Sequence, residues 1–555
     1  MSILDTRLDE MSTVGSDGKG ASRGGLVVAG LGLLLLVVTM GLAIFDEPYH
    51  IDELRQVSYY EQGFSEIARS AVSQDQPPLD YWIGMLVRDF FGRPSDAAER
   101  APAALFAIGA AVGVSALLWW SGRPIVAWVP LVIAALSPLY LAFGAYARPY
   151  GLPIALMVGF SVTAEWWRRS RRLSVLSFVF VFAILLPFSR TVEPPLFLAG
   201  VVVVLGAILL ANRTERWIVP ILMAGLVGLF VAFPVFRVLS NATADYRTGS
   251  INEFAVVGRR VREALGVIAS EQPLGLLMLG IGVVVAGVVT LRTLREGSAD
   301  GWWFLPLLGT PVASVLLFGL VANPGVPFFT RYGFFFVLPL AAGVALALEY
   351  IESRFTSRTL RLTVLGLLAA SLLVLGVPAT VRALSTTQIP DYQAAALAVN
   401  EELSSGTVVL YDDGTTVEEY RNPDFPGSPR YTNGLPVHES SNVARFGQTL
   451  AGGPVVVLSR GERLSAIGWW AFSIDEDFVI YSPQAAVRWG DRALGVALQS
   501  LCEGGDVESY GYLCVVAAQA YDASGDHAAA GALMESTATR ANEAGVIDRF
   551  GLSFD

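Results

Sequence analysis

The sequence predicts an α-helical polytopic membrane protein that carries an α/β domain at its C-terminal end. Of its 555 residues, 53% are hydrophobic and 16% are charged, and the mean hydropathy is positive, a composition richer in apolar residues than soluble domains usually are. Apolar runs long enough to cross a membrane recur through residues 25–380. From Gln388 onward, charged residues return and apolar residues alternate in short runs, as is typical of strands.

The apolar runs predict about eleven membrane-spanning helices. The first, Leu26–Phe45, follows a Ser-, Gly- and Asp-rich stretch, residues 1–24, which we expect to be a disordered cytoplasmic tail. No small-residue cleavage site precedes Asp46, so this run is expected to be an anchor and not a signal peptide. The later candidates are Arg100–Trp120, Ile125–Phe143, Gly151–Trp167, Leu173–Phe188, Pro195–Leu210, Trp217–Leu239, Leu274–Leu291, Trp302–Val321, Tyr332–Ile351 and Leu362–Val377.

Arginine placement predicts the orientation of these helices. One set of turns, on the side of the N-terminal tail, carries Arg123, Arg168, Arg169, Arg171, Arg172, Arg213, Arg216, Arg292, Arg295, Arg354, Arg358 and Arg361. By the positive-inside rule this side is the cytoplasm, and the membrane is the plasma (inner) membrane. The first loop (46–98), the Arg148 turn, the turns at 189–194 and 323–331, the loop 241–272 and the domain 381–555 then face outward.

The outward arginines break the positive-inside rule and need another explanation. For Arg190 and Arg237, snorkelling to the interface and a functional role carry equal weight. Arg259, Arg260 and Arg262 alternate with apolar residues, which favours an amphipathic helix on the membrane surface.

Polar groups recur at the outer membrane edge of the first loop. Asp52 and Glu53 follow the first span directly, where Pro48 interrupts the helix, and His50 precedes them. Solvated loop charges are the simplest interpretation of such a pair. However, Asp75 and Gln76 repeat the pattern before Pro77, Pro78 and the apolar piece Ile83–Phe91, which is too short to span and is expected at the interface.

The C-terminal domain is predicted to contain strands at Thr407–Tyr411, Pro454–Ser459 and Phe478–Tyr481, a helix at Tyr392–Leu403, and a helical hairpin within residues 492–544. The only two cysteines, Cys502 and Cys514, lie here, and a disulfide is plausible outside the cytoplasm. Trp469 and Trp470 suit stacking on sugar rings, although core packing explains such a pair more simply.

Four features together resemble the GT-C membrane glycosyltransferases, in the branch of protein O-mannosyltransferases, the lipid A aminoarabinose transferase and rhizobial core galacturonosyltransferases. They are the acidic pair after the first helix, the segment Pro77-Pro78-Leu79, the turn Ala147-Arg148-Pro149-Tyr150-Gly151-Leu152, and Phe329-Thr330-Arg331-Tyr332 before Leu338-Pro339-Leu340. The resemblance covers about residues 25–380. It implies a GT-C-like catalytic domain that moves a sugar from a polyprenyl-phosphate donor to a glycan, lipid or protein acceptor on the outer face, with inversion.

The resemblance also implies roles for individual residues. Asp52 matches the family's catalytic base, with Glu53 beside it. The leaving phosphate needs a cationic clamp and no acid, and Arg148 and Arg331 match that role. Tyr150, Tyr332 and Gln76 complete the donor phosphate site, and a divalent ion, Mg²⁺ or Mn²⁺, would be held by His50, Glu53 and Asp75. The chain departs from the family at Tyr146, where relatives have Glu, and at Gln76, where they have His or Lys.

Two other classes of protein fit the sequence less well. A formal charge of −11 argues against a nucleic-acid partner, since phosphate neutralisation needs clustered Lys and Arg. A multi-pass transporter, or a non-catalytic scaffold with an outer sensing domain, is the alternative to an enzyme. Transporters place ionisable residues near the bilayer midplane, whereas here they collect at helix ends, which favours chemistry at the interface.

Overall fold

The computed structural model divides the chain into two compact units. The helical unit comprises residues 1–46 and 59–386, and the C-terminal unit comprises residues 47–58 and 387–555. In the helical unit the structure describes residues 16–46, 60, 63–73, 77–91, 96–242, 254–271, 275–296, 299–321, 330–354 and 358–385. In the C-terminal unit it describes residues 53, 56, 408–411, 437–439, 455–460, 471–475, 478–481, 495, 499, 503, 514–515, 517–518, 521–522 and 524–543.

The first helix, α2, runs from Ser16 to Asp46. It therefore begins inside the stretch 1–24 that was expected to be disordered, because extending an existing helix adds one hydrogen bond for each residue fixed. Leu36 and Met40 are fully buried, whereas Leu26, Val27, Leu31 and Leu34 are more than half exposed. A row of exposed apolar side chains on one long helix indicates a lipid-facing surface.

Six of the described helices are long and apolar enough to cross a membrane. Their candidate spans are Gly25–Ile44, Ala97–Trp120, Glu193–Ala211, Ile218–Val235, Phe304–Val321 and Arg331–Ile351. The helices that contain the last five are α6 (Asp96–Trp120), α11 (Glu193–Ala211), α12 (Ile218–Ala242), α15 (Phe304–Val321) and α16 (Phe334–Arg354). A multi-pass membrane protein is therefore confirmed, and the total of about eleven spans stays a prediction.

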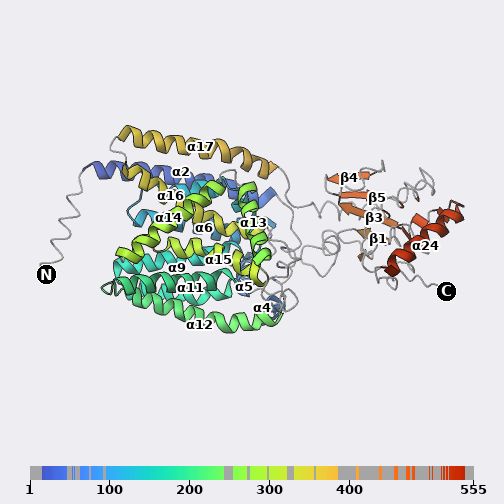
Figure 1. Ribbon diagram of the computed structural model, residues 1–555, viewed down its shortest axis with the longest axis horizontal. Coiled ribbons are helices and arrows are strands. Elements are labelled where there is room, and N and C mark those ends of the chain that lie inside the picture. The colour runs from blue at the N-terminus through green and yellow to red at the C-terminus, as the bar shows by residue number, and fades with distance from the viewer. Residues whose placement is uncertain are drawn as a thin grey trace. The chain divides into compact units, whose positions relative to one another are not determined.

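Four further predicted runs are also helical in the structure. They form α9 (Gly151–Ser170), α10 (Leu173–Leu185) with the short 3₁₀ helix η2 (Leu186–Phe188), α14 (Gly275–Glu296) and α17 (Arg358–Ser385). Helices α6 and α9 pack together, as do α11 with α15 and α14 with α16. Figure 1 shows the long helices lying side by side, with α13 (Phe254–Glu271), α4 (Phe64–Ser73) and α5 (Leu79–Phe91) at the end where α17 finishes.

One predicted span, Ile125–Phe143, is wrong as a single helix. It forms two short helices, α7 (Val129–Ala135) and α8 (Pro138–Gly144), separated at Leu136 and Ser137. Proline at the start of each helix lacks the N–H that a continuous helix would need there. The hydroxyl of Ser137 accepts a hydrogen bond of 3.1 Å from the backbone N–H of Tyr140, which caps α8.

The C-terminal unit contains a five-stranded sheet in the order β2-β1-β3-β5-β4. Strands β1 (Val408–Tyr411), β3 (Val455–Arg460) and β5 (Phe478–Tyr481) are those predicted from the sequence, and β2 (Val437–Glu439) and β4 (Ala471–Asp475) are additional. Strand β1 pairs in parallel with β2 and with β3, and β5 pairs antiparallel with β3 and with β4.

The end of this unit is helical where the structure describes it, with α24 at His527–Glu543. Cys514 is disulfide-bonded, and Cys502, the other cysteine of the sequence, lies outside the described residues. The expected helix Tyr392–Leu403 and the pair Trp469 and Trp470 lie outside the described residues.

Candidate functional site: an arginine and aromatic cluster

The turn before α9 is held tightly against α6. A Cβ atom on Gly151 would lie 2.4 Å from the backbone oxygen of Ala103, so only glycine permits this approach. The preceding backbone folds on itself, since the N–H of Arg148 donates to the oxygen of Tyr146 at 2.6 Å and the N–H of Tyr150 donates to the oxygen of Arg148 at 2.7 Å. As a result, Tyr146 and Tyr150 are buried while the Arg148 side chain is partly exposed.

Arg190 lies at the centre of the cluster. Its guanidinium carbon is 4.8 Å from the ring centroid of Tyr150, 5.7 Å from that of Tyr332 and 5.0 Å from that of Phe335. Each separation is within the range of a cation–π interaction. Its Nη1 also donates to the backbone oxygen of Pro149 at 3.3 Å. Arg190 therefore joins the turn before α9 to the start of α16.

Glu193 balances the charge of Arg190. The Arg190 Nε lies 2.7 Å from Glu193 Oε2, and the two side chains are only 13% and 3% exposed. Ser314 on α15 donates to the other carboxylate oxygen at 3.5 Å. Glu193 is also the first residue of α11, where a carboxylate is favoured by the helix dipole. The hydrogen bond from Ser314 thus ties the 189–194 turn to α15.

Further aromatic rings pack against the tyrosines that contact Arg190. Tyr140 stacks on Phe334 with 4.9 Å between ring centroids, and Tyr150 meets the edge of Phe334 at 6.4 Å. Phe318 of α15 lies 5.7 Å from Tyr332. Tyr150 therefore belongs to one aromatic group and Tyr332 to another, and Arg190 lies against both tyrosines.

Arg148 and Arg331 border this cluster. Arg148 precedes Pro149, whose oxygen receives the Arg190 hydrogen bond, and Arg331 precedes Tyr332 in the 3₁₀ helix η4 (Thr330–Gly333). Both side chains are partly exposed. Thus four of the residues assigned to the donor phosphate, Arg148, Tyr150, Arg331 and Tyr332, come from two turns that Arg190 joins.

Helix α13, expected on the membrane surface, packs one face against protein. Arg260 is only 2% exposed, pairs with Glu263 at 2.6 Å and lies 5.7 Å from the ring of Phe318. A Cβ on Gly319 of α15 would lie 3.1 Å from the Cα of Val257, so the two helices are in close contact. Arg260 therefore lies on the face of α13 that packs against protein, because glycine in α15 lets the two helices approach closely, and a position of α13 on the membrane surface stays a prediction. Arg259 remains exposed.

The short apolar piece after Pro77 and Pro78 is helical, as α5. Its 13 residues are too few to cross a bilayer. Trp82 stacks on Phe64 of α4 with centroids 4.3 Å apart, and its indole donates to the Phe64 backbone oxygen at 3.1 Å. Phe90 is 82% exposed, which fits a helix at a membrane interface.

The remaining predicted site residues are not brought into this cluster by the structure. Asp52, His50, Asp75 and Gln76 lie outside the described residues. Glu53 is described, belongs to the C-terminal unit, and is fully buried with an interaction partner. Among the described residues, no group of three His, Cys, Asp or Glu side chains forms a metal site. The base and the metal ligands therefore stay predictions.

No protein-family model and no curated protein sequence matches the chain. Among solved structures, ArnT from Cupriavidus metallidurans bound to undecaprenyl phosphate matches at 13% identity and a TM-score of 0.48, over 82% of this chain and 97% of that one. The Archaeoglobus fulgidus oligosaccharyltransferase with a tethered acceptor peptide matches at 10% identity and 0.48, over 79% and 69%. AglB from the same organism, with an inhibitory peptide and a dolichol-phosphate, matches at 12% identity and 0.45, over 86% and 72%.

Each of these matches has an identity below 15% and a TM-score below 0.5, so none of them assigns a function to this chain.

Proposed function

We propose that this protein transfers a sugar from a polyprenyl-phosphate donor to a cell-envelope acceptor on the outer face of the membrane. The observation that carries the proposal is the convergence of Tyr150 and Tyr332 on Arg190, with Arg148 and Arg331 at the borders. Aromatic and guanidinium groups at a membrane interface suit a ligand with an anionic phosphate on an apolar chain.

The chemistry assigned to the site is a single displacement. The acceptor oxygen or nitrogen attacks the anomeric carbon, the bond from that carbon to the phosphate oxygen breaks, and the configuration inverts. Asp52 receives the acceptor proton, and the electron pair of the broken bond leaves with the polyprenyl phosphate. The phosphate leaves as a stable anion, so it needs positive charge and not a proton.

The arginines divide into two roles. Glu193 already neutralises Arg190, so Arg190 positions the two tyrosines and adds little net charge. Arg148 and Arg331 then provide the positive charge for the phosphate. Guanidinium groups suit this task because they offer two parallel N–H donors to adjacent phosphate oxygens.

The test is binding of polyprenyl phosphate to the full chain, followed by transfer kinetics once a donor is identified. Arg148→Ala and Arg331→Ala should each weaken binding by about tenfold or more, the loss of one charge-assisted contact. Arg259→Ala is the matched control, since Arg259 is exposed on α13 outside the cluster. Unchanged binding in both test variants would mean that these arginines anchor the helices at the membrane interface and do not bind the phosphate.

Asp52→Asn separates binding from chemistry. It should retain polyprenyl-phosphate binding and lose about 10²–10⁴ in rate, because a neutral amide cannot accept the proton. Full activity in this variant would remove Asp52 as the base.

A divalent ion, Mg²⁺ or Mn²⁺, at His50, Glu53 and Asp75 is part of the proposal. Such an ion would neutralise charge on the leaving phosphate. Activity that survives EDTA treatment unchanged would exclude the metal while leaving the arginine site intact.

We assign acceptor recognition to residues 381–555.

The alternative is a transporter or a non-catalytic scaffold. Both would bind a polyprenyl phosphate without consuming a sugar donor. If Asp52→Asn abolishes the function of the protein in cells while protein levels and lipid binding stay normal, the enzyme is favoured.

A further inference from the structure

A second arginine cluster lies at the opposite end of α9 from Tyr150. The helix has 20 residues, so its two ends are about 30 Å apart, close to the thickness of the bilayer core. Its last turn carries Arg168 and Arg169, and the chain turns at Arg171 and Arg172 before α10 begins. This cluster is therefore at the other membrane face from the proposed donor site.

A buried glutamate holds two arginines of this cluster in place. Glu165 is 1% exposed and accepts hydrogen bonds from Arg168 Nε at 2.8 Å and Nη2 at 2.7 Å, and from Arg169 Nε at 3.0 Å. Arg169 also donates to the backbone oxygen of Trp120. These contacts fix the two guanidinium groups against the end of α6, and the single carboxylate cannot neutralise both.

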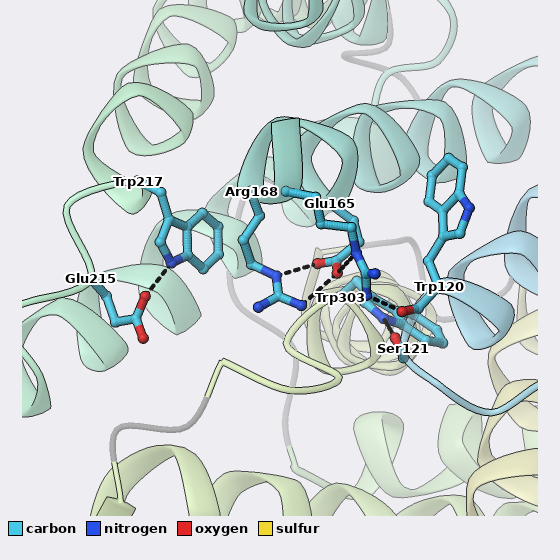
Figure 2. A network of polar contacts seen from close by, with 8 residues as sticks. Trp120, Ser121, Glu165, Arg168, Glu215, Trp217 and Trp303 are labelled. Carbon is cyan, nitrogen blue, oxygen red and sulfur yellow. Dashed lines mark hydrogen bonds and ion pairs between the residues drawn. The ribbon is translucent and has the colours of Figure 1, made fainter. Parts of the chain in front are cut away.

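Trp217 joins this helix end to the next turn along the membrane face. The guanidinium carbons of Arg168 and Arg171 each lie 5.9 Å from its ring centroid, and Trp167 donates to its backbone oxygen at 3.2 Å. Its indole N–H donates to Glu215. Figure 2 shows Arg168 between the indole of Trp217 and the carboxylate of Glu165. The 168–172 and 212–217 turns are therefore neighbours.

Positive charge exceeds negative charge here, although the chain as a whole is acidic. Six arginines stand against three acids: Arg168, Arg169, Arg171, Arg172, Arg213 and Arg216 against Glu165, Glu215 and Asp300. Within the part of the chain that the structure describes, the outer four arginines, Arg171, Arg172, Arg213 and Arg216, are exposed and form no ion pair.

We infer that this cluster binds the headgroups of anionic phospholipids in the leaflet opposite the proposed donor site. Exposed arginines at the end of a membrane helix lie at the depth of lipid phosphates, and buried tryptophans anchor the same helix ends. Charge complementarity selects an anionic headgroup over a zwitterionic one. The inference does not depend on the transferase activity.

The experiment is native mass spectrometry of the delipidated full chain titrated with phosphatidylglycerol or phosphatidylcholine. The wild type should bind phosphatidylglycerol more tightly. Arg171→Gln with Arg216→Gln, one substitution on each of the two neighbouring turns, should weaken phosphatidylglycerol binding about tenfold or more, through the loss of charge-assisted contacts to the phosphate of one bound headgroup. Phosphatidylcholine binding should not change.

The matched control is Arg292→Gln with Arg295→Gln. These two arginines are also exposed and end α14, which is predicted to reach the same face. Their replacement should leave phosphatidylglycerol affinity within about twofold of the wild type.

Three outcomes would overturn the inference. They are equal losses in the two double variants, unchanged affinity in the Arg171 and Arg216 variant, and full displacement of phosphatidylglycerol by inorganic phosphate, which would indicate a free-anion site. Thermal unfolding in phosphatidylcholine nanodiscs should be the same for both variants, which separates lost binding from lost folding.

Discussion

Replacement of Arg190 by methionine tests whether one side chain holds the arginine and aromatic cluster together. Methionine keeps most of the length of arginine but removes its charge and its hydrogen-bond donors. Glu193, whose side chain is 3% exposed, would then keep its charge without a cation beside it. The rings of Tyr150, Tyr332 and Phe335 would lose the group that they share.

The expected cost follows from these contacts. Two unit charges 2.7 Å apart attract by about 6 kcal/mol at an effective dielectric constant of about 20, and desolvation offsets most of this gain. Removing one member of a buried pair costs about 3–5 kcal/mol, because the other charge stays buried. Three cation–π contacts at about 1 kcal/mol each are also lost, and methionine recovers part of them through sulfur–aromatic contacts. We expect a total loss of about 4–6 kcal/mol.

A double-mutant cycle with Glu193→Gln separates the charge from the packing. The double variant removes the uncompensated carboxylate, so it should be about 2 kcal/mol or more stable than Arg190→Met alone. Unfolding would be followed by circular dichroism as the fraction of sodium dodecyl sulfate in mixed micelles is raised. A loss below about 1 kcal/mol in Arg190→Met, or a double variant as unstable as the single one, would refute this account of the cluster.

Two further substitutions test how the turn before α9 is supported. Gly151→Ala should destabilise the protein by about 1–3 kcal/mol, because its Cβ would lie 2.4 Å from the Ala103 oxygen, whereas Gly109→Ala on α6 meets nothing within 4 Å and should be neutral or stabilising by up to about 1 kcal/mol. Thermal unfolding of both variants in one detergent makes the comparison. Ser137→Ala removes the α8 cap on Tyr140 and should lower the free energy of unfolding by about 1 kcal/mol; no change would mean that the two prolines alone divide the segment.

Most of the helical unit could be predicted because length and apolarity determine a membrane helix almost alone. The error at Ile125–Phe143 shows where this reasoning stops. Hydropathy does not distinguish one long helix from two short ones, and the break depends on Pro130, Ser137 and Pro138, which are individually tolerated within helices. A capping serine followed by a proline in the middle of an apolar run is the sequence signal that predicts such a break between two helices.

Sequence motifs pointed to residues of the arginine and aromatic cluster but not to its centre, and the phosphate-binding role of those residues stays a prediction. Arg148, Tyr150, Arg331 and Tyr332 were assigned from motifs, and the structure places their two turns together. Arg190 carried no motif, and interface snorkelling explained it equally well from the sequence. Its role depends on rings that lie about 40 and 140 residues away in the chain, which no local pattern encodes.

Spacing along the chain does separate two kinds of arginine, and this is a rule that the sequence could have supplied. Among the described residues, four arginines pair with a carboxylate of their own helix or turn: Arg168, Arg190 and Arg260 with a glutamate three residues away, and Arg169 with one four residues away. Residues three or four apart share a helix face, so such pairs neutralise each other locally. Arg148 and Arg331 have no acid within four residues on either side. Arg123 also has no acid within four residues, yet it lies 2.5 Å from the carboxylate of Glu349, far away in the sequence. Spacing therefore identifies arginines with a local acid but does not reveal distant partners, so the proposed phosphate role of Arg148 and Arg331 depends on the binding assay.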